Sequence, residues 1–444
     1  MNIQLSDNFT YKKLFRFTLP SIIMMIFTSI YGVVDGFFVS NYVGKTEFAA
    51  VNFIMPFLMI LGAVGSMLGT GGNALISKTL GEGDNDKAKK LFSLFIAISV
   101  LSGIIISILA FIFIRPIASF LGADGEMLDN CVLYGRIIII ALPALMLQYE
   151  FQSFFITAQK PQLGLMVTII SGLTNIILDA LLIVIFPLGI YGAAIATAIS
   201  QAIGGIIPLI YFLSPNSSLL RLSKPTFFDG KSLLKACSNG FSEFLSNISM
   251  SLVSMFYNIQ LIKYAGENGV AAYGVLMYVN LIFLSVFIGY SLGTAPIIGF
   301  NYGAKNHNEL KSLLKKSTII ISTFSVFMVL AAQLLAKPLA MIFVSYDQEL
   351  LDLTLRGFQI FSFSFLFAGI SIFGSSFFTS LNNGLISALI SALRTLVFQI
   401  AAVMILPLFF DIDGIWSSIV IAEILSAILT VIFIIAKRKK YNYL

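Results

Sequence analysis

The sequence predicts an all-α polytopic membrane protein with twelve transmembrane helices in two six-helix lobes related by a parallel pseudo-two-fold repeat. Hydrophobic residues make up 58% of the 444 and charged residues only 11%, whereas a soluble protein carries about 25% charged residues. Polar clusters divide the chain into twelve apolar runs, each near or above the ~20 residues that cross the hydrocarbon core of a bilayer. In addition, the two halves of the chain repeat one another.

The twelve predicted spans follow one another with short connections. A hairpin as short as Leu188-Gly189 leaves no room for a separate soluble domain. We therefore expect an N-terminal lobe over residues 1–213, a lobe linker over 214–235 and a C-terminal lobe over 236–444. The spans are placed near residues 14–40, 48–76, 91–114, 131–157, 163–186, 190–213, 236–262, 270–298, 313–336, 353–380, 384–410 and 414–436.

Basic residues collect in alternate loops. Of the 27 Lys and Arg residues, 20 fall in the N-terminus, the even-numbered loops and the C-terminal tail, whereas the other loops carry acidic runs such as 124–129 and 347–352. This positive-inside bias predicts a multi-pass protein of the cell membrane with both termini in the cytoplasm. The net charge of +6 therefore reflects topology, and the expected surroundings are membrane lipid rather than nucleic acid.

The sequence predicts neither a removable signal peptide nor a disulfide bond. The N-terminal polar region contains an acid and no small-residue cleavage site closes the first apolar run, so we expect no removable signal peptide. Cys131 and Cys237 fall near opposite membrane faces in this topology, so we expect no disulfide between them.

The internal repeat has a nearly constant spacing of 222 to 225 residues. Leu68-Gly69-Thr70 recurs as Leu292-Gly293-Thr294, and Ser153-Phe154-Phe155 recurs as Ser376-Phe377-Phe378. Chance matching explains isolated pairs but not an offset that is kept along the whole chain. Because each half has an even number of spans, both enter the membrane from the same side. Transporters that rock one lobe against the other use this arrangement.

The acidic residues of the first half are not repeated. Asp35 aligns with Tyr257, and Asp179 aligns with Ala402 or Val403. A duplicated scaffold with unduplicated acids indicates a site that was added to the scaffold.

Five carboxylates lie inside the predicted spans. An ionised carboxylate in hydrocarbon costs at least ~2.5 kcal/mol, so such residues face the protein interior or a wet cavity. Buried ion pairs are the alternative, but only Arg136 and Arg394 lie well inside predicted spans. Two cations cannot neutralise five anions, which favours an ion or a substrate that comes and goes. The five carboxylates are Asp35, Glu150, Asp179, Glu243 and Glu423.

Four oxygen-bearing side chains share one depth in the outer leaflet. At ~1.5 Å per helical residue, Asp35, Asp179 and Thr197 lie roughly 9 to 12 Å below the outer ends of their spans. Asn175 lies one turn before Asp179 and on the same face. This set of hard oxygen ligands suits Na⁺. Without a metal ion, two close carboxylates repel each other and can carry a proton instead. A hydrogen-bonded helix contact is the alternative.

Four stretches carry a resemblance to a known family: GVVDGFFVSNYVG (32–44), LGEGD (80–84), LTNIILDALLI (173–183) and GAAIATAISQ (192–201). Together they resemble the multidrug and toxic compound extrusion (MATE) family, and the resemblance covers the entire chain. It implies a cation site in the N-terminal lobe of prokaryotic members, whose residues correspond here to Asp35, Asn175, Asp179 and Thr197. Some members also use a carboxylate in the tenth span, which residues 361–378 lack.

The remaining polar residues inside spans have two interpretations each. Arg394 and Glu423, at mid-depth on neighbouring spans, predict a structural ion pair. Glu243 either attracts a cationic substrate or accepts hydrogen bonds. The candidate residues of a substrate cavity, for which core hydrogen bonding is the alternative, are Thr28, Tyr31, Gln148, Gln152, Gln201, Glu150 and Glu243.

The leading functional hypothesis is an antiporter, coupled to Na⁺ or H⁺, that exports small cationic amphipathic drugs by alternating access. We expect it to act as a monomer without an organic cofactor. A lipid-linked oligosaccharide flippase of the same superfamily would need a more cationic cavity. A membrane-embedded enzyme is disfavoured because the one histidine, His307, lies in a predicted loop and no metal-binding HExxH motif occurs. A channel is disfavoured because the acids lie in one half only.

Overall fold

The bilayer leaves backbone N–H and C=O groups without water, so spanning segments form helices or closed barrels. The computed structural model describes residues 3–223, 228–345 and 347–443, and these residues contain helices and no strand. The first half of the chain forms α1 (Tyr11–Tyr42), α2 (Lys45–Gly81), α3 (Asn85–Leu121), α4 (Gly125–Thr157), α5 (Pro161–Asp179), the π-helical turn η1 (Ala180–Ile185) and α6 (Gly189–Leu213).

The second half of the chain repeats this series with more interruptions. It forms α7 (Gly230–Gly303), α8 (His307–Val344), α9 (Gln348–Phe361), the 3₁₀ turn η2 (Ser362–Ser364), α10 (Phe365–Ser380), α11 (Gly384–Ala392), the π-helical turn η3 (Leu393–Phe398), α12 (Gln399–Ile405) and α13 (Pro407–Tyr441).

The long helix α7 contains two spans. Gly266 has φ 59° and ψ −150°, which is not helical. The rings of Tyr257 and Tyr273 stack with their centroids 5.0 Å apart, whereas sixteen residues of continuous helix would separate them by about 24 Å. The chain therefore reverses at Gly266. Eleven helices in the described part of the chain are long and apolar enough to cross a membrane, and α7 contributes two spans, so the predicted fold class is confirmed.

The turns of the two halves repeat at the spacing seen in the sequence. Residues with positive φ recur 222 or 223 positions apart, in the pairs Gly44 and Gly266, Gly83 and Lys305, Gln159 and Asn382, and Gly189 and Asp411. The last pair places a turn at Asp411, inside α13, where the backbone is not helical. The twelfth span therefore starts after Asp411, in agreement with the predicted start near residue 414.

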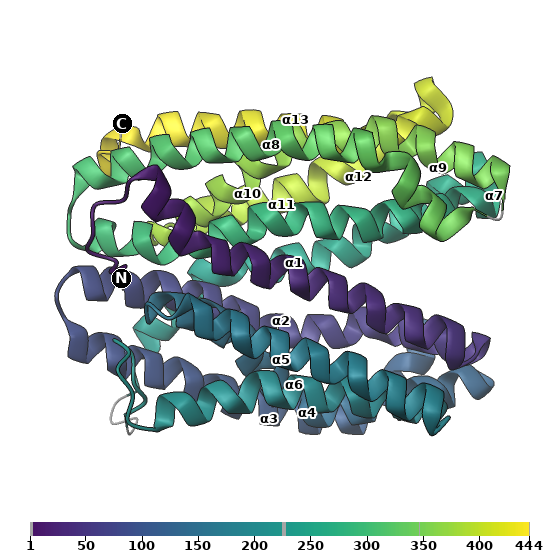
Figure 1. Cartoon of the computed structure of the whole chain (residues 1–444), viewed down its shortest axis with the longest axis horizontal. Coiled ribbons are helices and arrows are strands. Elements are labelled where there is room, and N and C mark those ends of the chain that lie inside the picture. Colours follow the sequence, from purple (N-terminus) through teal and green to yellow (C-terminus); the bar gives the residue numbers. More distant parts are fainter. Residues whose placement is uncertain (1–2, 224–227, 346, 444) are drawn as a thin grey trace.

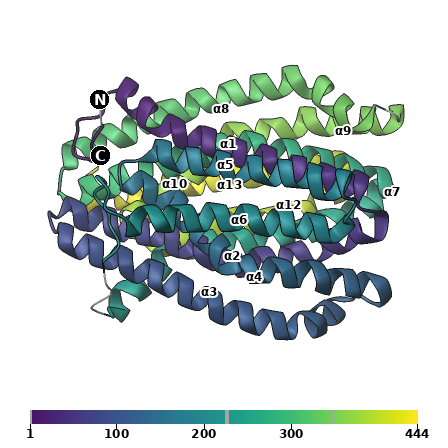
Figure 2. The same cartoon turned by 60° about the horizontal axis from the view of Figure 1, so that its bottom comes forward.

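The two lobes lie side by side, with α1 running diagonally between them (Figure 1). Both chain termini lie at one end of the bundle, which we call the basic end because Lys78, Lys305 and the tail Lys437–Lys440 also lie there. Figure 2 shows α3 and α8 on opposite flanks. Both carry rows of exposed aliphatic side chains, as expected of surfaces that face lipid.

The N-terminal segment is tied to the second lobe at the basic end. The backbone N–H of Phe9 donates to Oε1 of Glu309 in α8 at 2.9 Å, and Nζ of Lys316 donates to the carbonyl of Phe9. Farther along, the Ser29 hydroxyl donates to the carbonyl of Leu281 in α7 at 3.3 Å. Helix α1 therefore contacts both lobes.

Paired glycines bring the lobes together at the basic end. A Cβ on Gly81 would lie 1.9 Å from the carbonyl oxygen of Phe300, and a Cβ on Gly303 would lie 2.0 Å from that of Lys78. These two contacts are equivalent under the internal repeat, since both partners are displaced by 222 residues. Only glycine permits such backbone contact between helices.

Helix α7 begins inside the region that we expected to form the lobe linker. We expected the linker to extend to residue 235, but α7 begins at Gly230, and residues 224–227 lie outside the described residues. The reason is a helix cap: the side chain of Asp229 accepts a hydrogen bond from the backbone N–H of Ser232 at 3.0 Å. Such a cap stabilises a helix start by about 1 kcal/mol.

The hairpin at Gly266 gives a test of the fold. We expect Gly266→Ala to destabilise the protein by about 1–3 kcal/mol, because its φ and ψ belong to a region open only to glycine. Gly274→Ala is the matched control, since a Cβ there has no neighbour within 4 Å and φ is not positive. Thermal unfolding in detergent should show a lower midpoint for the first variant only. Equal midpoints would contradict the reversal at Gly266.

Candidate functional site

The five carboxylates inside the spans find different surroundings. Of these five carboxylates, only Glu423 forms an ion pair within the described part of the chain, and its partner is Arg394. The other intramembrane cation, Arg136, is exposed and lies over the ring of Phe111 at 4.9 Å. Four acids thus remain without a cation from the protein.

Asp35, Asn175, Asp179 and Thr197 come together from α1, α5 and α6. The side-chain amide of Asn175 and the hydroxyl of Thr197 each donate to Oδ1 of Asp35 at 3.4 Å. Asp179 is 0% exposed, and neither of its oxygens has a hydrogen-bond partner in the described part of the chain. The two carboxyl groups are close enough to interact electrostatically. The arrangement can hold a cation or a shared proton between them.

Local helix geometry gives this cluster its shape. Asp179 is the last α-helical residue of α5, and the π-helical turn η1 starts at the next position. Such turns are rare and occur often at functional sites. On the facing side, a Cβ on Gly172 would lie 2.9 Å from the ring of Tyr31, so glycine at this position lets α1 approach α5 closely.

Sequence reasoning missed Tyr134, which borders the cluster from α4. Its side chain is buried, and its hydroxyl lies beside Thr197 and near both Asp35 and Asp179. The hydroxyl also approaches Sδ of Met55 at 3.9 Å. Its depth along the helix gives a signal for it, because Tyr134 lies nine residues after Gly125, where α4 begins.

The cluster is not a site for a transition metal. Within residues 3–223, 228–345 and 347–443, no three His, Cys, Asp or Glu side chains come together to hold a metal ion. The oxygens of two carboxylates, an amide and a hydroxyl fit a hard cation instead.

A small pocket lies between α4, α5 and α6 on the side of the cluster toward the basic end, with Thr168 seven residues before Asn175 and Gly204 seven residues after Thr197. Gln148 and Gln152 supply its amide groups, and its other lining residues are Phe151, Phe155, Gly164, Val167, Thr168, Gly204 and Pro208. Oε1 of Gln148 is buried without a hydrogen-bond partner in the described residues, and Gln148 also lies beside Tyr31. The pocket therefore combines aromatic walls with an unsatisfied acceptor.

Three other predicted cavity residues have distinct surroundings. The Thr28 hydroxyl donates to the carbonyl of Met24 in its own helix at 2.9 Å. Oε1 of Gln201 is buried without a partner among the described residues. Glu150 is 0% exposed, its backbone packs against Gly69 of α2, and its carboxyl group lies near Ser99 of α3. Neither carboxyl oxygen has a hydrogen-bond partner in the described residues. Glu150 thus points away from the pocket that Gln148 and Gln152 line.

The second lobe holds a separate charged group. Nε of Arg394 donates to both oxygens of Glu423 at 2.9 Å, and a terminal nitrogen contacts Oε1 at 2.8 Å. Arg394 belongs to the π-helical turn η3, and Glu423 is 2% exposed. Glu243 of α7 is exposed and lies within electrostatic reach of Arg394. The ion pair is neutral overall, so it leaves Glu243 as the uncompensated charge of this group.

Comparison with known proteins gives matches along the whole chain. A family model described as MatE matches residues 20–181 and 244–405. The chain is 28% identical over 434 residues to a multidrug export protein MepA of Staphylococcus haemolyticus (strain JCSC1435), covering 97% of this chain and 94% of that protein. It is 25% identical over 433 residues to the protein of the same name from Staphylococcus aureus (strain MRSA252), with the same coverage.

A solved structure shares the fold. It is described as the outward-facing conformation of a multidrug resistance MATE family transporter of the MOP superfamily. The TM-score is 0.94 at 22% identity, covering 100% of this chain and 99% of that one.

The Arg394–Glu423 pair makes a prediction about stability. We expect Arg394→Met to destabilise the protein by about 3–5 kcal/mol, because it leaves a buried carboxylate without its partner. The double variant Arg394→Met/Glu423→Leu should recover most of this loss. Thermal unfolding in detergent measures both. Equal losses in the single and double variants would show that Glu423 does not need its partner.

Proposed function

The chain belongs to the MatE family of membrane transporters, and we propose that it is an antiporter that exports small drug-like compounds in exchange for Na⁺ or H⁺. Members of this family are transporters and not enzymes. The relatives named multidrug export proteins support drug-like compounds as the substrate class. Positive-inside bias supports a cytoplasmic location for the basic end.

One observation carries the proposed ion coupling. Asp179 is fully buried, neither of its oxygens has a hydrogen-bond partner among the described residues, and it lies beside Asp35. A charged carboxylate in this position needs a counter-ion or a proton, since removing it from water is costly. A bound cation would find Asp35, Asn175 and Thr197 as further oxygen ligands. A proton shared by the two carboxyl groups would neutralise the same site.

Exchange follows if drug and coupling cation compete. Two carboxylates without a cation partner among the described residues attract a cationic compound into the N-terminal lobe, toward Asp35 and Asp179. Binding of Na⁺ or H⁺ at Asp35 and Asp179 removes that attraction. The two ligands then disfavour each other, which is the thermodynamic requirement for antiport.

The flippase alternative receives no support from the charge distribution. Such a protein would hold a pyrophosphate group and need cations facing its cavity. Here Arg394 is occupied by Glu423 and Arg136 is exposed over the ring of Phe111, so the buried groups without a counter-charge in the described spans are carboxylates.

We expect Asp35→Asn and Asp179→Asn each to reduce ion-coupled efflux by at least about tenfold, the factor produced by ~1.4 kcal/mol of lost cation binding. Efflux from proteoliposomes under separately imposed Na⁺ and H⁺ gradients measures the effect and identifies the ion. Tyr257→Phe is the matched control, because Tyr257 aligns with Asp35 in the repeat and its hydroxyl has no partner in the described residues. Normal coupling in both Asn variants, or lost coupling in the control, would refute the site.

Competition between the ligands can be measured directly by calorimetric titration of a cationic drug. We expect its affinity to fall in saturating Na⁺ if Na⁺ is the coupling ion, or at low pH if the ion is H⁺. The drug should weaken cation binding by the same factor, because coupling free energy is reciprocal. A drug affinity that is the same in all conditions would place the drug elsewhere and defeat the shared site.

A further inference from the structure

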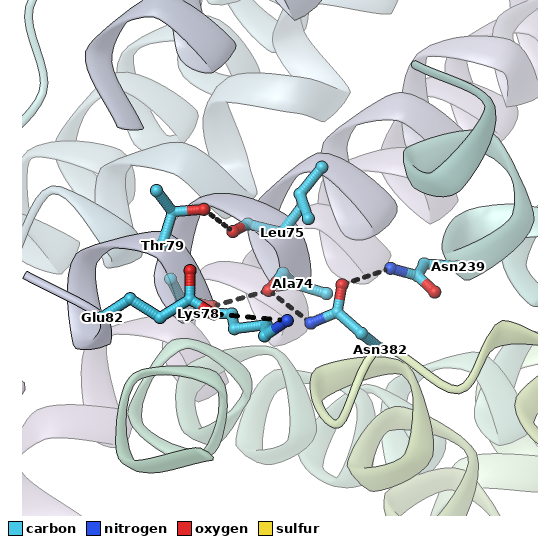
Figure 3. A network of polar contacts seen from close by, with 8 residues as sticks. Ala74, Leu75, Lys78, Thr79, Glu82, Asn239 and Asn382 are labelled. Carbon is cyan, nitrogen blue, oxygen red and sulfur yellow. Dashed lines mark hydrogen bonds and ion pairs between the residues drawn. The ribbon is translucent and has the colours of Figure 1, made fainter. Parts of the chain in front are cut away.

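The side chain of Asn382 forms a hydrogen bond from the second lobe to the first at the basic end. Asn382 lies in the turn between α10 and α11, and its amide Nδ2 donates to the backbone carbonyl of Ala74 in α2 at 3.0 Å. Its Oδ1 accepts from Nδ2 of Asn239 in α7 at 2.7 Å. The amide thus joins two elements of the second lobe to a helix of the first (Figure 3).

The orientation of this amide is fixed by chemistry. A backbone carbonyl only accepts hydrogen bonds, so the NH₂ group of Asn382 must face Ala74. Asn239 then supplies the donor that the carbonyl oxygen of Asn382 requires. Asn239 is buried, and its backbone carbonyl accepts from the Thr379 hydroxyl at 3.4 Å. A hydrogen bond in such a low-dielectric position is stronger than one exposed to water.

Backbone contacts hold α2 within reach of this amide. A Cβ on Gly240 would lie 1.9 Å from the carbonyl of Met67, and a Cβ on Gly299 would lie 2.2 Å from Oγ of Ser77. On the other side, a Cβ on Gly384 would lie 2.1 Å from the carbonyl of Ser238. Both spans of α7 thus contact α2 around Ala74, and the start of α11 packs against the first of these spans.

The hydrogen bond is absent from the equivalent position of the repeat. Gln159 occupies the turn between α4 and α5, 223 residues before Asn382, and both have positive φ, 61° and 57°. In the described part of the chain Gln159 makes no side-chain hydrogen bond to the second lobe, and the contact of Asn382 with Ala74 has no counterpart there. The bond therefore depends on this asparagine and not on the duplicated scaffold.

We propose that Asn382 is a latch that holds the two lobes together at the basic end and sets how often that end opens. This proposal depends on alternating access, which is part of the proposed function. In this structure the latch is closed, with α2 packed against both spans of α7. Opening of the basic end requires the Asn382–Ala74 bond to break, while the Asn239–Asn382 bond stays within one lobe. Loss of the latch should therefore shift the population of conformers without unfolding either lobe.

Spin labels on the two lobes can measure this population. With Cys131 and Cys237 replaced by alanine, labels at Asp86→Cys in α3 and Asn308→Cys in α8 occupy exposed positions at the basic end. Double electron–electron resonance in lipid nanodiscs then gives the ratio of separated to closed lobes. We expect Asn382→Gly, which keeps the positive φ accessible, to raise this ratio by about threefold to tenfold, as hydrogen bonds between membrane helices allow.

Two further variants make the test specific. Gln159→Gly is the matched control and should leave the ratio unchanged. Asn382→Asp keeps the acceptor for Asn239 but loses the donor to Ala74, so it should raise the ratio of separated to closed lobes as well. If Asn382→Gly does not fold, Asn382→Asp alone tests the latch. An unchanged ratio in the Asn382 variants, or an equal rise in Gln159→Gly, would overturn the latch.

The result can be separated from the proposed transport function. If the parent protein exports drugs but the Asn382 variants leave the distance ratio unchanged, the latch is wrong and the transport function stands. If the variants open the basic end but the parent exports no drug under either ion gradient, the latch stands and the proposed function fails.

Discussion

The free-energy cost of a carboxylate without a counter-charge inside the membrane decides which polar contacts this protein forms within its helix bundle. Each acid within the spans must find a cation, a proton, hydrogen-bond donors or a wet surface. Glu423 has Arg394, and Asp35 has the donors Asn175 and Thr197. Asp179 has neither a cation nor a donor among the described residues. The N-terminal lobe therefore carries negative charge without a partner among the described residues, and the ion coupling that we propose depends on that charge.

A second theme is the contrast between a symmetric frame and asymmetric polar groups. The turns at Gly44 and Gly266 and the lobe contacts at Gly81 and Gly303 recur at the same spacing. They are backbone features, so they set where helices reverse and how closely the lobes approach. Asp35 and Asp179, the acids of the proposed cation site, lie in the first half, and Asn382 lies in the second. The repeated backbone features thus form the shared frame, whereas the polar groups of the two proposals are not repeated.

Much of the fold was predictable because depth in a membrane is a local property. The positions of the spans follow from runs of apolar residues, and most predicted edges agree with the helix ends to within a few residues. The depths of Asp35, Asp179 and Thr197 follow from counting along each span, and the structure places these residues together. The region predicted as the lobe linker overlaps the first turns of α7, because the cap at Asp229 starts that helix. The reversal within α7 leaves a clear signal in the sequence as two separate apolar runs.

By itself the sequence determined the number of spans, the repeat, the charge bias and the layer of the cation site, since each depends on residue type and linear spacing. Only the tertiary structure decided which way each side chain points. It places Glu150 against Gly69 and away from the pocket that Gln148 lines. It also joins Asn382 to the carbonyl of Ala74. The direction of the Glu150 side chain depends on how α4 is rotated about its axis, which its neighbours decide. The acceptor for Asn382 is a backbone carbonyl, which every residue has, so this contact leaves no pattern in the sequence.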